Sequence, residues 1–527
     1  MSLSLKLRCQ QGFTTVTLMG VLAVGGLLVA AGFAAVDSDT ALTREDQDYK
    51  QSYGAAEGGL QWYLNRMGQD NNFYVRCTAV PAPNATELAP VNQRWNGTGA
   101  DPRIWRRLPG EQAEYTVELM PAPGYSSCVQ NDQYSMVDPN GNMTVRVTGR
   151  SRGEYRTVLA TLRRSNFIDF IYFTDFETLD PSAYSTASDT SRATRECSSY
   201  RVSRTSFCVE IQFTATDVVD GPFHTNDNLQ ICGGATLGRS TRDAIEISGS
   251  PRWVNGGCTA NPNVLGTLVH PASQLALPPS NAAVETVVQP AYKFKGRTHI
   301  ALNGSTMSVT TGYDVGSVST TTMPLPANGV IYVDNSLSGS CSAGFVRSQT
   351  YSGTGRGAST SCGNAWISGT YSSDLTIAAD NDVIVEDDVA RSDDGVLLGL
   401  VANNFVRVYH PVAFGSGPGN PACTNTGETG GRRIDAAILA LQHSFIHDNW
   451  YCGAPTGDIN VYGAIAQKFR GPVGTGSGAT ITTGFRKDYA YNDRLRYREP
   501  PYFLDPVQAS WRISRESEQV PAVKPPS

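Results

Sequence analysis

A cluster of carboxylates between positions 380 and 394 has the residue types for two kinds of chemistry. The cluster contains Asp380, Asp382, Glu386, Asp387, Asp388, Asp393 and Asp394. Oxygen-rich turns can coordinate calcium, for which Asp380, Asp382 and Asp387 are weak candidates. Paired carboxylates such as Asp382 and Glu386 can also hydrolyse glycosidic bonds. Solvated turns are the simplest interpretation, because Asp and Asn tolerate turn geometry.

The histidines give little indication of a metal or catalytic site. His443 and His447 lie four residues apart, but Ser444 stands where the HExxH zinc motif has glutamate. His224, in the segment His-Thr-Asn-Asp, fits a turn residue better than a general base. The chain has no nucleophile elbow and no phosphate-binding loop. We therefore predict no catalytic residues, no metal beyond the calcium candidates, no cofactor and no enzymatic activity.

The cysteines indicate an oxidising compartment. Cys9 lies near the start, and ten others follow in an order that allows neighbours to pair. These disulfide candidates are Cys77 with Cys128, Cys197 with Cys208, Cys232 with Cys258, Cys341 with Cys362, and Cys423 with Cys452. Sequence alone leaves the connectivity open. The spacings contain no CxxC, which argues against a zinc ribbon.

The beginning of the chain combines a basic leader with a long apolar run. Lys6 and Arg8 precede Gly12, and no residue from Phe13 to Val36 is charged. As a helix this run would be about 36 Å long, enough to cross a bilayer. We therefore expect a single-pass inner or cytoplasmic membrane protein with an extracytoplasmic body. An ordinary signal peptide is the alternative, because Gly32-Phe33-Ala34 is a passable cleavage site.

This start resembles the N-terminus of type IV prepilins. The resemblance implies cleavage between Gly12 and Phe13, methylation of the new Phe13 amine, and assembly through the apolar helix. Pilins usually have glutamate at the fifth mature position, where this chain has Thr17. That glutamate is thought to pair with a neighbour's terminal amine in the apolar filament core, where an unpaired charge is costly. Thr17 therefore favours a minor subunit, located at the tip, over a major pilin.

The helix is expected to continue past the apolar run. Its polar half has an apolar stripe at three- and four-residue spacing, formed by Tyr49, Tyr53, Ala56, Leu60, Tyr63, Leu64 and Met67. The stretch Ala55-Ala56-Glu57-Gly58-Gly59-Leu60 resembles PilX-type minor pilins. We expect this amphipathic half to pack on a head domain.

The rest of the chain reads as mainly β structure. Alternating strands at 115–119, 144–149 and 156–162 predict a small antiparallel pilin-type sheet. From about 167, short apolar triplets recur between Gly, Asn and Asp turns, which is typical of a parallel β-solenoid with inserts. A jelly-roll or β-sandwich is the alternative, because eight-residue spacing also suits antiparallel strands. Phrases such as "LTIAADNDVIVEDDV" resemble a large pilus-associated family whose body is solenoid-like.

The predicted organisation has five parts. They are a leader at 1–12, a membrane and assembly helix at 13–67, an α+β head at 68–166, a solenoid-like domain at 167–505 and a polar tail at 506–527, in which disorder is expected from about residue 515. The net charge of −6 and scattered basic residues argue against nucleic-acid binding.

Two functions fit this organisation. The first is a minor pilin or pseudopilin-like subunit at a filament tip, displaying a large extracytoplasmic body for assembly priming or surface adhesion. Its partners would be other pilin or pseudopilin subunits, an inner-membrane assembly platform, a prepilin peptidase and a surface or polysaccharide ligand. The second is a membrane-anchored β-helix enzyme that acts on polysaccharide.

Overall fold

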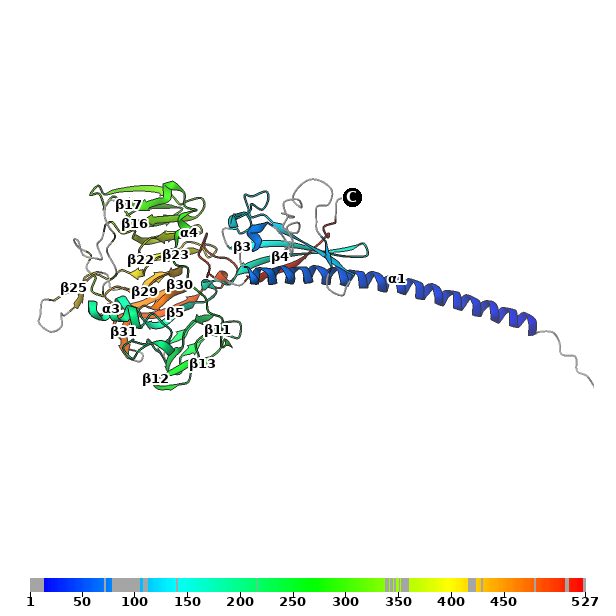
Figure 1. The fold of residues 1–527 in the computed structure, drawn as a ribbon, viewed down its shortest axis with the longest axis horizontal. Helices are drawn as coiled ribbons and strands as arrows, with labels where there is room; N and C mark the ends of the chain where they lie inside the picture. The colour runs from blue at the N-terminus through cyan, green and yellow to red at the C-terminus, as the bar shows by residue number, and fades with distance from the viewer. Residues whose placement is uncertain are drawn as a thin grey trace, which may run out of the picture.

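The computed structural model describes most of the chain outside the N-terminal leader. The described residues are 14–70, 73–77, 105–107, 112–138, 141–215, 217–336, 341, 345, 347–349, 351, 360–415, 423–427, 430–477, 480–507 and 511–524. A long helix, α1 (Thr14–Gln69), projects from a small head, and a larger β body lies beyond the head (Figure 1). The predicted leader, Gly12 and Phe13 lie outside the described residues.

The sequence predicted that the first half of this helix spans a membrane and that the protein is a single-pass membrane protein. Both predictions were wrong. Within the part of the chain that the structure describes, no helix combines the length and apolarity needed to cross a membrane. The predicted single-pass membrane anchor is therefore not supported.

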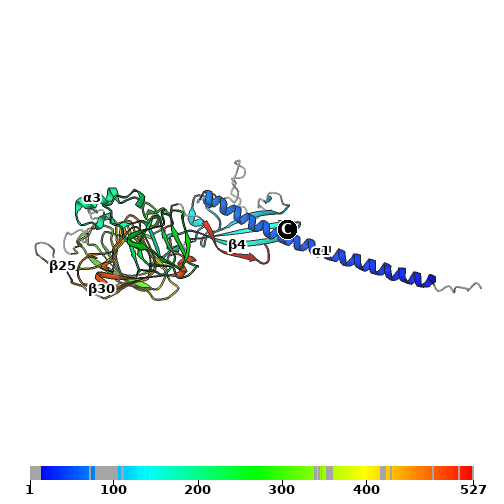
Figure 2. The ribbon, with the colours of Figure 1, turned by 90° about the horizontal axis from the view of Figure 1, so that it is seen from below.

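The head is an antiparallel sheet packed against the second half of α1. Its strands, in spatial order, are β1 (Arg106–Arg107), β2 (Glu114–Met120), β3 (Asn142–Ser151), β4 (Glu154–Arg164) and β33 (Trp511–Gln519). The buried side chains of α1 recur at three- and four-residue spacing, as in Ala56, Leu60, Tyr63 and Met67. They pack on the apolar face of the sheet, which Figure 2 shows alongside the helix. Short helices η1 (Phe73–Arg76) and η2 (Gln133–Ser135) complete the head.

Residues 515–519, which the composition predicted to be disordered, form part of a strand. Trp511–Gln519 forms β33, which pairs antiparallel with β4 along most of its length. Trp511 is buried in the head core, and Ile513 packs against it. The chain therefore leaves the head after β4 and returns to the same sheet at β33, so the whole body is inserted into the head.

One parallel sheet runs the length of the body. In spatial order it contains β15 (Lys293–Lys295), β19 (Val330–Asp334), β21 (Leu375–Ala379), β23 (Leu398–Ala402), β28 (Ala437–Ala440), β30 (Pro455–Arg470), β5 (Tyr172–Leu179), β8 (Phe223–Thr225), β11 (Ala244–Ile247) and β14 (Thr267–Val269). Its inner strands, such as β21 and β23, are short, apolar and fully buried, as expected where both faces of a parallel sheet are covered.

The opposite wall of the body is also built from parallel strands. One sheet contains β16 (Thr298–Gly304), β20 (Ala365–Tyr371), β22 (Val383–Arg391), β24 (Val406–Val408), β27 (Arg432–Ile434), β29 (Phe445–His447), β30 and β32 (Thr480–Tyr491). Two three-stranded sheets continue the wall: β6 (Phe213–Thr214), β9 (Leu229–Gly233) and β12 (Trp253–Ala260), and β7 (Val218–Val219), β10 (Thr236–Leu237) and β13 (Asn263–Val264). Successive strands therefore stack as rungs, in parallel, and not as the antiparallel pairs of a jelly-roll.

In-register columns of apolar side chains fill the space between the walls. One column comprises Ile331, Ile377, Leu400, Ile438, Ile465, Tyr172, Phe223, Ile245 and Leu268. All of these side chains are buried except Leu268 of the last rung. Because a single rung cannot bury its own apolar face, this stacking creates the core.

The chain enters and leaves the body in the middle of its stack of rungs. It enters at β5, forms rungs toward one end at β14, and then crosses to the other end before winding back to β30 beside β5. The crossing segment, 270–292, contacts successive rungs through bonds such as Ala272 N–H to Ile247 O and Asn281 Nδ2 to Ala379 O. In Figure 1 the early and late rungs accordingly meet in the centre, at β5 and β30.

Smaller elements decorate the body. The antiparallel strands β17 (Thr306–Thr311) and β18 (Ser319–Pro324) extend β16 at one end. Others are β25 (Val412–Phe414), β26 (Cys423–Asn425), β31 (Gly474–Ser477), α3 (Ala187–Glu196), α4 (Ala282–Glu285), η3 (Phe167–Asp169), η4 (Pro181–Ala183), η5 (Arg201–Ser203), η6 (Pro290–Tyr292) and η8 (Asp493–Arg496).

Candidate functional site

The free half of α1 has a continuous apolar surface. Leu18, Met19, Val21, Leu22, Val24, Leu27, Leu28 and Val29 are each more than half exposed. Gly20, Gly25 and Gly26 have no heavy atom within 4 Å of the position that a Cβ would take. Soluble monomers rarely leave an apolar surface of this size uncovered, and such surfaces usually mark contacts with other molecules. We refer to residues 18–29 as the rod surface. Thr17 lies in α1 immediately before it.

The structure separates the acidic residues that the sequence grouped. Asp380 accepts hydrogen bonds from the Tyr332 hydroxyl and the Asn335 N–H. Glu386 lies 2.9 Å from the His299 ring, and Asp387 pairs with Arg432. Within the described residues, no group of three or more His, Cys, Asp or Glu side chains could hold a metal ion.

Asp382 belongs to a buried network around Arg407. The Arg407 guanidinium forms two bonds to Asp448, at 2.8 and 2.9 Å, and one to Asp382 at 3.0 Å. The Tyr351 hydroxyl donates to Asp448 at 2.6 Å. Burial raises the pKa of Asp382, although the Arg407 charge opposes this effect. Asp382 is bound to Arg407 in the core, whereas Glu386 bonds to the His299 ring. The two carboxylates therefore do not share a partner, and Asp382 has a structural role.

The histidines that were weighed as metal ligands or bases are packed individually. His443 bonds to Asp180 at 3.1 Å and stacks on Phe405. His447 is fully buried beside His410, and burial lowers its pKa well below the ordinary value, so it is neutral at physiological pH. His224 bonds to Glu246 and Asn226 in the core.

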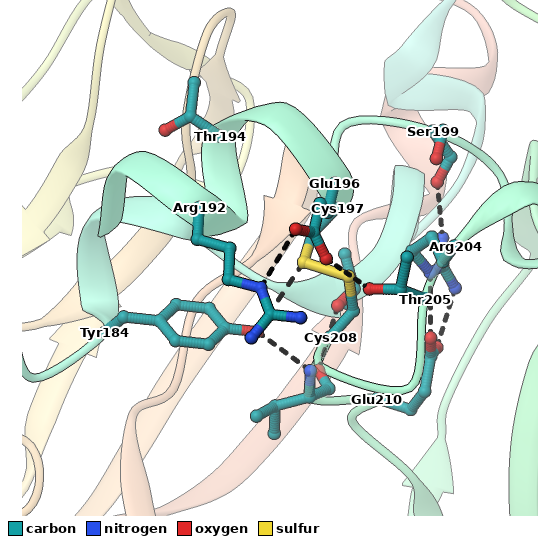
Figure 3. The surroundings of a disulfide bond; sticks show 12 residues. Tyr184, Arg192, Thr194, Glu196, Cys197, Ser199, Arg204, Thr205, Cys208 and Glu210 are labelled. Atoms are coloured by element: carbon teal, nitrogen blue, oxygen red, sulfur yellow. Dashed lines mark hydrogen bonds and ion pairs between the residues drawn. A yellow bond between two sulfur atoms is a disulfide. The ribbon is translucent and has the colours of Figure 1, made fainter. Parts of the chain in front are cut away.

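All ten candidate cysteines form disulfides between sequence neighbours. The pairs are Cys77–Cys128, Cys197–Cys208, Cys232–Cys258, Cys341–Cys362 and Cys423–Cys452. The second pair joins Cys197, directly after α3, to Cys208, as Figure 3 shows. Beside it, Arg204 forms paired bonds to Glu210 at 2.6 and 2.8 Å, and Tyr184 accepts from the Val209 N–H. The segment around α3 is therefore held by covalent and polar links together with a small apolar cluster that includes Ala193, Phe345 and Phe405.

A buried polar cluster joins the head to the body. Asn166, which follows β4, donates through Nδ2 to Glu499 at 2.5 Å and to Asp505 at 3.0 Å. Arg163, at the end of β4, is buried and pairs with Glu499. Both chain segments that cross between head and body thus meet in one cluster, which sequence analysis did not identify because its members are more than 300 residues apart. We call Arg163, Asn166, Glu499 and Asp505 the junction cluster.

The junction cluster predicts a pH dependence of stability. Burial, together with the nearby charge of Asp505, raises the pKa of Glu499 well above its ordinary value of 4.5. The folded protein therefore keeps this proton at pH values where the unfolded chain has lost it. The free energy of unfolding consequently falls as pH rises from about 4.5 to the raised pKa.

The variant Glu499→Gln tests this dependence, because glutamine keeps the bond from Asn166 but does not ionise. Unfolding should be measured between pH 5 and pH 8. The free energy of unfolding of wild type should be higher at pH 5 than at pH 8. In the variant this difference in free energy should be smaller, by about 1.4 kcal/mol for each pH unit by which the wild-type pKa is raised. An unchanged pH slope would show that Glu499 is not the group responsible.

A cleft of about 500 Å³ lies next to this junction. Ser165 and Arg512 line it from the head side, and Glu246 with Gln274 lines it from the body side. Its volume is within the range of small-molecule sites. Several of its charged groups already have partners: Arg512 bonds to Asp169 at 2.7 Å, Glu246 to buried His224, and Arg496 to Asp243. The bond from Arg512 to Asp169 thus links β33 of the head to η3 beside the body.

Comparison with known proteins gives one similar structure to report. No protein-family model and no curated protein matches the chain. Among solved structures, the chain is similar to the competence-associated pilin ComZ from Thermus thermophilus, with 12% sequence identity. The match covers 90% of this chain and 97% of that chain, with a TM-score of 0.28. The likeness is thus to a pilin, at an overlap too low to support an argument about this chain.

Proposed function

We propose that this chain is a minor pilin-like subunit that joins a filament through α1 and displays the inserted body beyond the head. The observation that carries the proposal is the division of α1 into two halves. Its second half is covered by the head sheet, whereas the rod surface has exposed apolar side chains over residues 18–29. Burying such side chains against helices of other subunits is favourable at about 25 cal/mol per Å² of apolar surface.

In this proposal the N-terminus is matured before assembly. A prepilin peptidase cleaves between Gly12 and Phe13, and the new Phe13 amine is methylated. An assembly platform then inserts the rod into the filament. Thr17 lacks the carboxylate that would pair with a neighbour's terminal amine, which disfavours a position between major subunits and favours the tip. The body, which joins the head at the end away from the rod, would prime assembly or contact a surface.

The assembly role can be tested by shearing filaments from cells and measuring how much of the protein co-purifies. Leu22→Arg places a charge on the rod surface and should remove the protein from the filament fraction. Val202→Arg is the matched control, because Val202 is an exposed apolar residue on the body. The proposal is contradicted if wild type is absent from sheared filaments, or if Leu22→Arg co-purifies as wild type does.

A further inference from the structure

A group of aromatic rings lies on the outer face of the wall that contains β16, β20 and β22. His299 of β16 stacks on Trp366 of β20, with ring centres 5.1 Å apart, and it also contacts Tyr313 at 5.3 Å. Trp366 in turn contacts Tyr409 at 5.7 Å. Ile300, the next residue after His299, points into the core, so His299 faces away from it. The rings of His299, Tyr313 and Tyr409 are only half-buried and can be reached from solvent.

Arg297 lies against these rings. Its guanidinium carbon is 5.4 Å from the centre of the Trp366 ring and 5.6 Å from the centre of the Tyr313 ring. The Nε and Nη2 atoms of this guanidinium are buried without a hydrogen-bond partner, and so is Nε1 of Trp366. Arg297 as a whole is only half-buried. Buried donors are normally satisfied, so an acceptor from outside the chain is expected at this position.

The charge of Arg297 is also uncompensated. Burial lowers the pKa of Arg297, and the nearby Tyr313 and Glu386 do not make up for this effect. At Arg407 burial acts in the same direction, but Asp448 and Asp382 outweigh it and the pKa is raised. Arg297 therefore differs from the structural Arg407, and an anionic group beside it would restore the stabilisation that burial removes.

Glu386 is placed beside the rings by a break in the register of β22. The pairing of β20 with β22 shifts after Ile367, which lies opposite Val385. Bulges of this kind re-aim side chains. One carboxylate oxygen of the half-buried Glu386 lies 2.9 Å from Nδ1 of His299, which belongs to β16, two strands away. A hydrogen-bond acceptor therefore lies next to the unpartnered donors.

These side chains together suit one class of ligand. We call Arg297, His299, Tyr313, Trp366, Glu386 and Tyr409 the aromatic patch. Ring faces attract apolar C–H groups, polar side chains exchange hydrogen bonds with hydroxyl groups, and a lone guanidinium attracts a carboxylate. A sugar ring that has a carboxylate combines an apolar face, a rim of hydroxyl groups and one negative charge. An acidic sugar therefore uses every kind of group in the aromatic patch.

The charges around the aromatic patch disfavour a densely charged ligand. Asp387 and Asp388 follow Glu386 on the same bulge, and the Arg432 side chain pairs with both of them. Three consecutive carboxylates thus lie at this edge of the patch. Double-stranded DNA has one charge per about 1.7 Å of its axis, which would place phosphates against these carboxylates. A polysaccharide with few carboxylates avoids this repulsion.

We propose that the aromatic patch binds a polysaccharide whose carboxylates are widely spaced along the chain. One sugar lies on the half-buried rings, its carboxylate bonds to Arg297, and its hydroxyl groups bond to Glu386 and the tyrosine hydroxyls. This ligand would account for the surface contact of the body, and in that respect the inference rests on the proposed function. Binding itself requires the body and not assembly into a filament.

Isothermal titration calorimetry of the full-length protein tests the ligand class. The probe is hyaluronan hexasaccharide, in which each carboxylated sugar alternates with a neutral amino sugar. Chitohexaose, a neutral chain of the same amino sugar, should bind at least about tenfold more weakly, because it cannot form the charged hydrogen bond to Arg297. A single-stranded oligonucleotide should not bind.

Arg297→Gln tests the residue that carries the inference. This variant should bind hyaluronan hexasaccharide at least about tenfold more weakly than wild type. Its unfolding midpoint should stay unchanged or rise, because the substitution removes a half-buried charge that has no counter-ion. Arg252→Gln is the matched control, since the Arg252 guanidinium lies 4.1 Å from the centre of the Trp253 ring elsewhere on the body. The control should bind as wild type does.

Several results would overturn the proposal. They are no binding of hyaluronan by wild type, equal or tighter binding of chitohexaose or of the oligonucleotide, and equal binding by Arg297→Gln and Arg252→Gln. A lower unfolding midpoint for Arg297→Gln would also overturn it, because Arg297 would then have a structural role. Failure of the assembly role looks different: wild type would bind hyaluronan in solution and yet be absent from sheared filaments.

Discussion

Replacing Arg407 by methionine is expected to lower the free energy of unfolding of the body by about 3–5 kcal/mol. Arg407 is buried between Asp382 and Asp448, which it binds through three hydrogen bonds of 2.8–3.0 Å. Methionine fills a similar volume but leaves two carboxylates in the core without their cation. Desolvated charges of this kind are costly, and partial protonation recovers only some of the loss.

Chemical unfolding followed by tryptophan fluorescence measures this effect. Arg407→Lys should lose less stability than Arg407→Met, because lysine keeps the charge but cannot form the paired bonds to Asp448. Arg486→Ala is the control, since Arg486 pairs with Asp458 at the surface and its removal should leave the unfolding midpoint unchanged. A wild-type midpoint for Arg407→Met would show that the Arg407 network does not stabilise the body.

The second large effect is expected at Gly149 of β3, where α1 touches the sheet. A Cβ at this position would lie 1.9 Å from the Ser52 carbonyl oxygen and 2.6 Å from the Ala56 nitrogen. Both contacts are with the helix backbone, which cannot move aside without lifting α1 from the sheet. We therefore expect Gly149→Ala to destabilise the head by at least about 2 kcal/mol.

Gly54→Ala provides the matched control for Gly149→Ala. Gly54 lies in α1 close to Ser52, but nothing lies within 4 Å of the position that its Cβ would take. Alanine favours a helix over glycine by up to about 1 kcal/mol, so this variant should be more stable than wild type. Hydrogen exchange of residues 52–67 locates the change. Equal exchange in wild type and Gly149→Ala would refute the close helix–sheet contact.

Local patterns in the sequence were sufficient for several features of the fold. The apolar spacing of Ala56, Leu60, Tyr63 and Met67 identified the face of α1 that packs on the head. The order of the cysteines suggested the five disulfides. Four pairs close loops with sequence separations of 11 to 29 residues, and Cys77 and Cys128 are 51 residues apart. Short apolar triplets such as Val383-Ile384-Val385 lie on parallel rungs, since such strands are covered on both faces.

Features that depend on distant parts of the chain were not predictable. The chain from about 515 was predicted to be disordered because it is polar and rich in proline. Residues 511–519 instead form an edge strand, whose pairing partner β4 lies some 350 residues earlier. The sequence does not show that the first and last rungs are neighbours in the middle of the body. β5 and β30, which pair there, have the same kind of sequence as other strands. The junction cluster and Arg407 were missed for the same reason. A single Arg, Asn or Glu in a polar stretch does not reveal that it will be buried.

Mass spectrometry of the N-terminus of the mature protein tests the central proposal most directly. If the chain is a pilin-like subunit, the N-terminal peptide begins at Phe13 with a methylated amine, and the rod surface is retained. A mature protein that begins near Ala35 would have lost residues 18–29, and with them the surface through which we propose that the subunit assembles. That result would contradict the account.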